Sequence, residues 1–198
     1  DEYTSVTGIG ESLARELYSI YFQARGIPVA NLHIEHAYQN IYRNLDRGND
    51  ASDAVNHMRT LLQKRIANVL RPGMVAVTGG YLPILGTKRG YSDKTGALLA
   101  DAAHNEFPNT VYLVEKEFPL MSADPKRIPE AKPIRRMTHF LARELFGDVR
   151  GAKGGALHSE ALDILSRKGI NIVVMNPEEP PAAENTTLIQ DFTAEPNG

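Results

Sequence analysis

The sequence of 198 residues predicts an α/β fold, a three-layer α-β-α sandwich with a mainly parallel central sheet. Short β-branched, apolar runs at residues 74–77 and 170–175 have the composition of strands buried in a parallel sheet. Longer segments between such runs repeat their apolar residues at the spacing of a helix. This alternation is typical of a sheet that helices cover on both faces.

Each element has its own signal along the chain. A first helix is expected over residues 11–24, because Leu13 and Leu17 recur at helical spacing and Gly26 is a suitable stop. Pro72-Gly73 ends a second helix. Helices are expected over residues 11–24, 51–70, 93–106, 138–146 and 158–168, and strands over residues 27–34, 74–77, 111–114 and 170–175.

The remaining segments lack a clear periodicity. Residues 115–133 form a long, proline-containing stretch, and residues 151–155 form a glycine-rich turn. We expect one partial domain over residues 1–192, followed by a tail or linker start over residues 193–198. Because the sequence begins at Asp1 and not at methionine, we expect a processed product or a fragment.

Composition excludes several classes of function. The formal net charge is −2, so the basic excess of a nucleic-acid-binding protein is absent from the sequence. The sequence contains no cysteine, which excludes disulfides, thiolate metal sites and thiol nucleophiles. No apolar run approaches the roughly 18 residues of a membrane span. A cytoplasmic enzyme that binds neither nucleic acid nor a membrane is the class that we expect.

A first group of candidate residues follows the run at 74–77. Gly79-Gly80 can bring backbone N–H groups close to an anion, and the helix expected after it begins with partial positive charge. Arg89 can grip a carboxylate through two parallel hydrogen bonds. The alternative is a solvated loop in which Ser92 or Asp93 caps the helix.

A second group lies in the long stretch after the strand at 111–114. Long ordered loops that follow strands often carry function, and Lys116 and Lys126 have the charge to face phosphates. The alternative is a surface loop that Phe118 and Leu120 hold against the domain.

The third group is the glycine-rich turn, with Lys153 at its centre. It has the ingredients of a phosphate-binding loop but lacks the spacing of a Walker motif. The alternative is a flexible connection between two helices. The six histidines show no metal-ligand spacing, and we interpret them as core-edge or surface residues. These groups favour a phosphate-containing ligand and leave the reaction open. We expect no metal ion bound directly by the protein.

Taken together, segments over about residues 4–192 resemble, in order and in spacing, the aspartokinase branch of the amino-acid kinase family. Residues 7–11 resemble its Gly-Glu segment, and residues 89–93 resemble its Arg-Gly-Gly-Ser-Asp signature. Further matches are residues 77–80 (Val-Thr-Gly), 122–126 and 129–132 (Thr-Ala-Asp-Pro-Arg and Pro-Glu-Ala-Lys), 152–158 (Ala-Lys-Val-Leu-His) and 187–189 (Gly-Thr-Leu-Ile). Tyr91 and Lys116-Glu117-Phe118 resemble the branch associated with ectoine biosynthesis.

The resemblance implies transfer of the ATP γ-phosphoryl group to the β-carboxylate of L-aspartate, with Mg²⁺ held through the phosphates. It also implies an oligomer, expected as a homodimer. The implied roles are substrate binding by Glu11, Arg89 and Ser92, nucleotide binding by Glu115, Lys116, Met121, Lys126 and Lys153, and catalytic roles for Lys153 and Asp93. No nucleophilic side chain is needed, because the substrate carboxylate attacks the phosphorus.

The sequence also departs from that family's pattern. Its Lys-Phe-Gly-Gly segment is not found in these residues, so we expect this chain alone to be inactive. Glu115-Lys116 stands where Thr-Asp is usual, Tyr91 replaces a glycine, and Gly154-Gly155 is extra. Two alternatives therefore stay open. One is a related kinase with another carboxylate acceptor, such as glutamate; the other is a fragment that binds nucleotide or amino acid without catalysis.

Overall fold

A computed structural model describes residues 8–34, 51–80, 91–146, 157–179, 182 and 185–191 of the chain. The chain divides into two compact units, Asp1–Pro108 and Asn109–Gly198. Arg89 and Lys153 lie outside the described residues, as do the glycine-rich turn at 151–155 and the tail at 193–198. Across the described residues, no helix combines the length and the apolar character that crossing a membrane requires.

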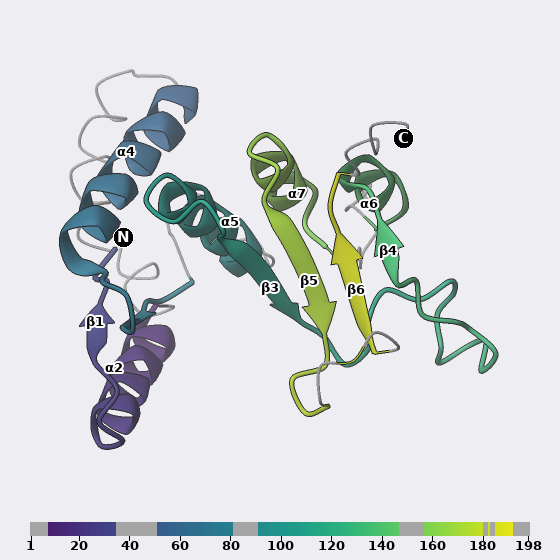
Figure 1. The fold of residues 1–198 in the computed structure, drawn as a ribbon, viewed down its shortest axis with the longest axis horizontal. Helices are drawn as coiled ribbons and strands as arrows, with labels where there is room; N and C mark the ends of the chain where they lie inside the picture. Colours follow the sequence, from purple (N-terminus) through teal and green to yellow (C-terminus); the bar gives the residue numbers. More distant parts are fainter. Residues whose placement is uncertain are drawn as a thin grey trace, which may run out of the picture. The chain divides into compact units, whose positions relative to one another are not determined.

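The first unit contains a parallel pair of strands with helices around it (Figure 1). β1 pairs with β2 in a register that places Val29 opposite Val75. The elements in chain order are α2 (Ile9–Gln23), β1 (Val29–Asn31), α4 (Ala51–Val69), β2 (Val75–Val77) and α5 (Tyr91–His104). All five lie at the positions that the sequence predicts.

The core of this unit lies mainly between α4 and α5. Met58, Leu62 and Ile66 recur every four residues and are almost completely buried on one face of α4. Ala97 and Leu98 of α5 are fully buried. The helical periodicity of the sequence therefore identifies the buried face of α4 correctly.

α2 is different, because its buried residues are polar. Arg15 and Ser19 are buried, whereas Leu13 and Leu17 are exposed. The Ser19 hydroxyl lies 2.9 Å from the backbone oxygen of Arg15 and 2.5 Å from Asn31 Oδ1, within hydrogen-bond distance of both. The apolar spacing predicts the helix correctly, but its apolar face does not pack into the unit.

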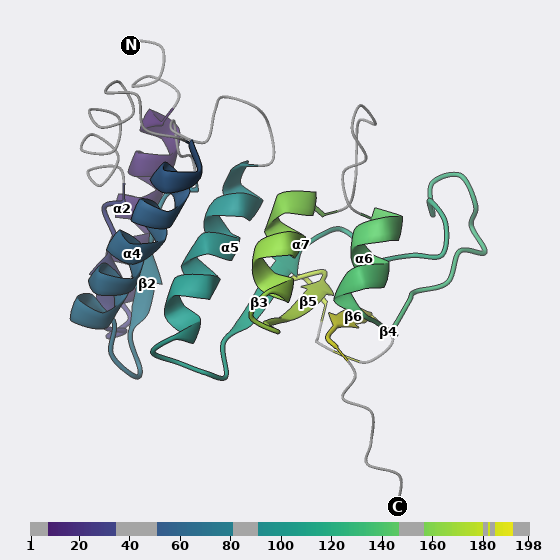
Figure 2. The ribbon, with the colours of Figure 1, turned by 90° about the horizontal axis from the view of Figure 1, so that it is seen from above.

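The second unit is built on a four-stranded sheet of order β3-β5-β6-β4 within the described part of the chain. β3 and β5 are parallel, as are β4 and β6, while β5 and β6 are antiparallel. The helices α6 and α7 lie side by side over the same face of this sheet (Figure 2). The elements are β3 (Val111–Glu115), β4 (Arg136–Met137), α6 (His139–Phe146), α7 (Ser159–Ser166), β5 (Asn171–Met175) and β6 (Thr186–Ile189).

The pairing is mainly parallel, and the predicted α/β class is confirmed. Gly26, the predicted stop of the first helix, and Gly169, which follows the end of α7, have positive φ angles of 73° and 62°. Residues with side chains rarely adopt this conformation, so glycine is the fitting residue at both ends. The strands β4 and β6 were not predicted, because two and four residues are too few to show a period in the sequence.

Two details correct the sequence analysis. The strand β3 is buried on one face only, because Val114 is buried while Val111 and Leu113 are about half exposed. His139 is a core residue and not a core-edge or surface one. Its ring Nε2 lies 2.9 Å from the backbone oxygen of Ile170, and its Nδ1 lies 3.1 Å from Asp191 Oδ1. This histidine therefore links α6 to the segments beside β5 and β6.

Candidate functional site

The first candidate site lies where β2 ends and Gly79-Gly80 follows. A Cβ atom added to Gly79 would lie 3.3 Å from Glu11 Oε2, so the Glu11 carboxylate faces this backbone. A Cβ atom added to Gly80 would lie 2.9 Å from the Cβ atom of Ser92. Three segments that are distant in sequence, the start of α2, the end of β2 and the first turn of α5, therefore meet here.

Two threonines hold the glycine segment in place through hydrogen bonds. Thr78 Oγ1 donates a 2.9 Å hydrogen bond to the backbone oxygen of Leu32, which follows β1. Thr95 Oγ1 donates a 2.8 Å hydrogen bond to the backbone oxygen of Gly80. Thr95 is buried and was missed by the sequence analysis, although its position three residues after Ser92 places both on one face of α5.

The charges and dipoles around the Gly79-Gly80 segment suit a ligand that carries charges of both signs. Glu11 stands in the first turn of α2 and supplies a carboxylate that can pair with an ammonium group. The first turn of α5 supplies backbone N–H groups that favour an anion. Because α5 begins at Tyr91, Ser92 and Asp93 lie inside that first turn and not at the capping position.

The second candidate site is a cavity of about 510 Å³ in the second unit, formed by the loop between β3 and β4. Most of its walls are apolar. Residues 116–125, Ile134 and Leu145 line it. Its volume falls in the range of small-molecule sites, and apolar walls with a few polar groups suit the flat base of a nucleotide.

This loop is ordered by hydrogen bonds within itself and to the sheet. The backbone N–H of Lys116 donates a hydrogen bond to the backbone oxygen of Met175 at 3.0 Å. Met121 and Pro133 form a single antiparallel β-bridge. The Ser122 hydroxyl accepts a 2.9 Å hydrogen bond from the Lys132 N–H. The alternative that Phe118 and Leu120 hold a surface loop is half right, because Leu120 is buried but Phe118 is exposed.

The predicted nucleotide-binding residues occupy different places around the cavity. Lys116 and Met121 line it, while Glu115 and Lys126 are not part of its lining. Lys126 Nζ donates a 2.9 Å hydrogen bond to Glu117 Oε2. This bond raises the pKa of Lys126 above its usual 10.5. Lys126 is therefore positively charged at neutral pH, and its ammonium group is paired with the Glu117 carboxylate.

Thr187 of β6 closes the base of this loop. Its Oγ1 accepts a 2.9 Å hydrogen bond from the Leu120 N–H and donates a 2.7 Å hydrogen bond to the backbone oxygen of Ile134. Thr187 is fully buried. One hydroxyl thus ties together two points of the chain that both line the cavity.

We expect Thr187→Val to destabilise the protein by about 2 kcal/mol, because it leaves two backbone groups without their partner. The midpoint of urea unfolding measures this change. Thr187→Ser retains the hydroxyl and should recover most of the loss. If valine, which keeps the methyl group, leaves the midpoint unchanged while serine lowers it, packing of the methyl group and not the hydrogen bonds is what matters.

The described residues were also compared with the arrangement that a metal-binding site requires. Among them, no group of three or more histidine, aspartate or glutamate side chains is arranged to hold an ion.

The fold and the two candidate sites describe an α/β protein with a glycine segment beside the Glu11 carboxylate in one unit and a mostly apolar cavity of small-molecule size in the other. Comparison with known proteins is more specific. The sequence model of the amino acid kinase family matches residues 2–176, and the chain belongs to that family. The predicted fold of this family is thereby confirmed, whereas its aspartokinase branch is not distinguished from other branches.

Individual relatives cover different shares of the chain. Glutamate 5-kinase from Synechococcus sp. (strain JA-2-3B'a(2-13)) is 26% identical over 193 residues, which are 91% of this chain and 47% of that protein. Among solved structures, aspartate kinase from Synechocystis has a TM-score of 0.52 at 20% identity, over 95% of this chain and 28% of that one. E. coli aspartokinase III with aspartate and ADP has a TM-score of 0.50 at 24% identity, over 74% and 31%. The chain thus spans about half the length of its curated relative.

Proposed function

We propose that the protein to which this chain belongs transfers the γ-phosphoryl group of ATP to the β-carboxylate of L-aspartate. The observation that carries the proposal is the Glu11 carboxylate facing Gly79-Gly80 beside Ser92. An amino-acid substrate needs a partner for its ammonium group and open backbone for its carboxylates. The match of residues 89–93 and 122–132 to aspartokinase motifs supports aspartate as the acceptor.

The acceptor site takes its charges from three sources. Glu11 pairs with the ammonium group of the substrate. Arg89 and Ser92, with the N-terminal backbone of α5, hold a carboxylate. Asp93 has a catalytic role in the same turn, by positioning the polar groups around the acceptor. Each of these assignments rests on the family resemblance together with the charge that the residue carries.

The nucleotide is assigned to the cavity of the second unit. Its apolar walls near Met121 take the base, and Glu115 at the end of β3 takes a polar group of the nucleoside. Lys116, Lys126 and Lys153 offer positive charge to the phosphates. Mg²⁺, when bound through the phosphate oxygens, neutralises part of their charge.

The reaction needs little covalent chemistry from the protein. An oxygen of the acceptor carboxylate forms a bond to the γ-phosphorus, the bond from that phosphorus to the bridging oxygen breaks, and ADP leaves with the electron pair. The product is an acyl phosphate. Catalysis then consists of positioning and of charge stabilisation, in which Lys153 takes part at the transferring group.

Glutamate is the second candidate for the acceptor. The 26% identity to a glutamate 5-kinase over most of this chain favours it. Glutamate differs from aspartate by one methylene, so the same ammonium and carboxylate partners can serve both. A third candidate is a binding fragment without catalysis, since the chain spans 47% of that relative.

The test is ATP-dependent formation of acyl phosphate by the full-length protein, trapped as a hydroxamate, with aspartate and glutamate offered separately. A strong signal with aspartate alone supports the proposal. A signal with glutamate alone replaces aspartate as the acceptor. If a folded protein binds ATP and gives no signal with either, the catalytic proposal is wrong.

Glu11→Gln should raise the KM for aspartate roughly 10- to 30-fold, because it removes a charge-assisted hydrogen bond to the ammonium group. The KM for ATP should change little. Glu16→Gln is the matched control, since it lies on the same helix and contacts Asn31 and Arg15 instead of the glycine segment. Equal effects of the two substitutions would contradict the role of Glu11.

A further inference from the structure

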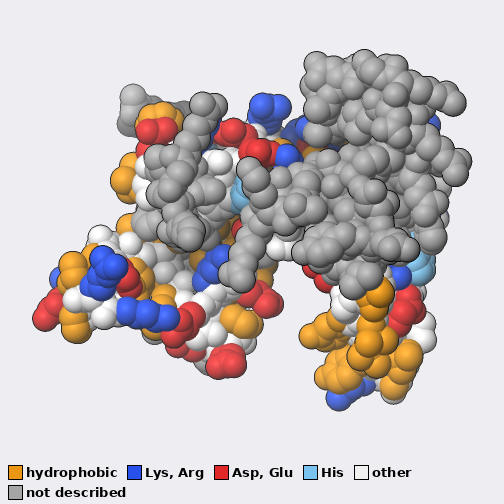
Figure 3. All heavy atoms as spheres, turned by 180° about the vertical axis from the view of Figure 1, so that it is seen from behind, with side chains coloured by type: hydrophobic (Ala, Val, Ile, Leu, Met, Phe, Trp, Pro, Cys, Tyr) orange, Lys and Arg blue, Asp and Glu red, His pale blue; other side chains and the backbone are white. Residues whose placement is uncertain are grey.

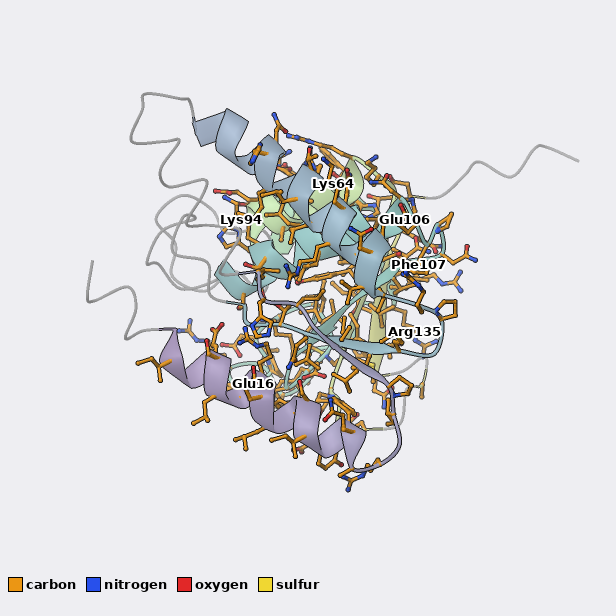
Figure 4. The ribbon with its side chains drawn as sticks, turned by 90° about the vertical axis from the view of Figure 1, so that its left-hand side faces the viewer. Glu16, Lys64, Lys94, Glu106, Phe107 and Arg135 are labelled. Carbon is orange, nitrogen blue, oxygen red and sulfur yellow. The ribbon has the colours of Figure 1, made fainter. Side chains whose placement is uncertain are left out.

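Two helices meet at the glycine segment Gly79-Gly80, and each supplies one side of the first candidate site. α2 turns its apolar side chains outward, and Figure 3 shows them as a lobe over this helix at the lower right. Its polar side faces the rest of its unit, where Figure 4 shows Glu16. Glu11 of the same helix approaches Gly79. The other side of the glycine segment belongs to α5, and there the contact depends on Thr95.

Thr95 uses its hydroxyl differently from most threonines in helices. A helical threonine often donates to the backbone oxygen three or four residues earlier in its own helix. Thr60 of α4 does so, because its Oγ1 donates to the backbone oxygen of Asn56 at 3.1 Å. Thr95 Oγ1 instead donates at 2.8 Å to the backbone oxygen of Gly80, fifteen residues earlier and outside the helix. The Thr95 hydroxyl therefore joins two segments and does not serve its own helix.

The bond between Thr95 and Gly80 is shielded from water. Only 1% of Thr95 is exposed, and Ala97 and Leu98, which follow it on α5, are fully buried. A backbone oxygen that loses its donor in such surroundings keeps the cost of its removal from water. The Gly80 carbonyl therefore has one strongly preferred direction, which is toward α5.

A glycine at this position needs an external restraint. A Cβ atom added to Gly80 would lie 2.9 Å from Ser92 Cβ and 3.2 Å from Ser92 Cα, so the close approach to α5 leaves room for glycine alone. Glycine also has the widest choice of backbone conformations, and here Gly79 precedes it. The space that requires glycine thus brings a mobile backbone with it, and the hydrogen bond from Thr95 removes that mobility.

The direction of the Gly80 carbonyl matters for a negatively charged ligand. A carbonyl oxygen carries partial negative charge and repels a carboxylate or a phosphoryl group that lies close to it. Turned toward Thr95, the Gly80 oxygen is occupied by a donor and directed at α5. Thr78 acts in the same way at the start of the segment, because its Oγ1 donates to the backbone oxygen of Leu32 at 2.9 Å. The segment is therefore held at both ends.

We propose that Thr95 is a positioning residue for the phosphoryl acceptor, whose hydroxyl locks the Gly80 peptide with its carbonyl toward α5 and away from the carboxylates of the acceptor. Thr95 acts through Gly80 and does not touch the substrate. The inference rests on the proposed function, because that function places the acceptor beside Gly79-Gly80. It holds equally for aspartate and for glutamate as the acceptor.

Thr95→Val in the full-length protein tests the lock, because valine keeps the shape of the side chain and removes the hydroxyl. We expect kcat/KM for the acceptor in the hydroxamate assay to fall about 30-fold, mostly through a higher KM, since the freed peptide shifts by less than about 1 Å. The KM for ATP should stay unchanged, because residues 116–125, 134 and 145 line the cavity assigned to the nucleotide. Thr95→Ser retains the hydroxyl and should recover most of the loss.

Thr60→Val is the matched control, since it removes a hydroxyl whose bond stays within α4. It should leave the KM for the acceptor as in the wild type. A purely structural role of Thr95 would reduce the amount of folded enzyme, which lowers the apparent kcat and leaves the KM unchanged. A wild-type KM for the acceptor in Thr95→Val, or equal losses in the serine and valine variants, would therefore overturn the proposal.

Amide hydrogen exchange, followed by mass spectrometry, tests the lock without turnover. Thr95→Val should speed exchange in fragments that contain residues 78–80, and Thr60→Val should not. If the wild-type protein forms no acyl phosphate with either amino acid, the proposed function fails, and faster exchange in Thr95→Val still establishes the lock. Unchanged exchange overturns the lock whether or not the enzyme is active. If Thr95→Val fails to fold, Thr95→Ala removes the same hydroxyl without a methyl group against the Gly80 oxygen, and the same outcomes decide.

Discussion

Replacing Gly80 by alanine is expected to lower kcat/KM for the acceptor about 100-fold. The new methyl carbon would lie 2.9 Å from Ser92 Cβ and 3.2 Å from Ser92 Cα, and the latter atom is backbone. No side-chain rotation relieves this contact, so either the Gly80 peptide or the first turn of α5 has to move. Displacements of about 1 Å at a phosphoryl acceptor cost on the order of 100-fold in rate.

Gly79→Ala is the natural comparison for this variant. Its methyl group would meet Glu11 Oε2 at 3.3 Å, and this atom is the end of a flexible side chain that can turn aside. We expect about a 10-fold loss at this position. ATP affinity should be retained in both variants, because the lining of the cavity comes from residues 116–125, 134 and 145. Equal losses of kcat/KM in the two variants would show that the contact between the new methyl group and Ser92 is not the cause of the loss.

Arg59→Ala is expected to lower the free energy of unfolding by about 3 kcal/mol. Arg59 Nε on α4 contacts Asp101 Oδ2 on α5, and the Asp101 side chain is only 2% exposed. Removing the arginine leaves a carboxylate buried without its counter-charge, and breaking such a pair costs about 3–5 kcal/mol. The lower end applies because Arg59 itself is 28% exposed. Urea unfolding followed by circular dichroism measures the change.

Arg127→Ala is the matched control for the ion pair. Arg127 also pairs with an aspartate, Asp124, at 3.6 Å, but the two side chains are 85% and 52% exposed. Exposed pairs contribute about 0–1 kcal/mol. The two variants remove the same type of side chain from an ion pair with aspartate, and the two pairs differ in the burial of both partners. A loss in Arg127→Ala as large as that in Arg59→Ala would argue against burial as the cause.

The two sites differ in how far sequence alone could define them. Gly79-Gly80, Ser92 and Asp93 were predictable, because glycines after a strand and before a helix form a local signal. Glu11 entered only through family resemblance, since one glutamate in a helix carries no pattern. Thr95 and Thr187 were missed, because a buried threonine that satisfies a distant carbonyl looks in sequence like any other threonine.

The amino-acid sequence by itself determined the kind and order of the main elements. The spacing of Met58 and Leu62, the β-branched runs and the glycines at Gly26 and Gly169 act through contacts within a few residues, which local sequence encodes. It also determined that α2 is a helix with an apolar stripe, but not where that stripe points. A stripe that faces a core and a stripe that faces away from it have the same period.

Only the tertiary structure decided which distant segments meet. The strand β6 lies between β5, to which it is antiparallel, and β4, to which it is parallel. This place depends on pairing across the sheet, which a four-residue strand cannot signal alone. The approach of Glu11 to Gly79-Gly80, the bond from Thr95 to Gly80 and the closure of the loop by Thr187 join residues far apart in the chain. Such contacts follow from how the elements pack, and local propensity carries no information about that packing.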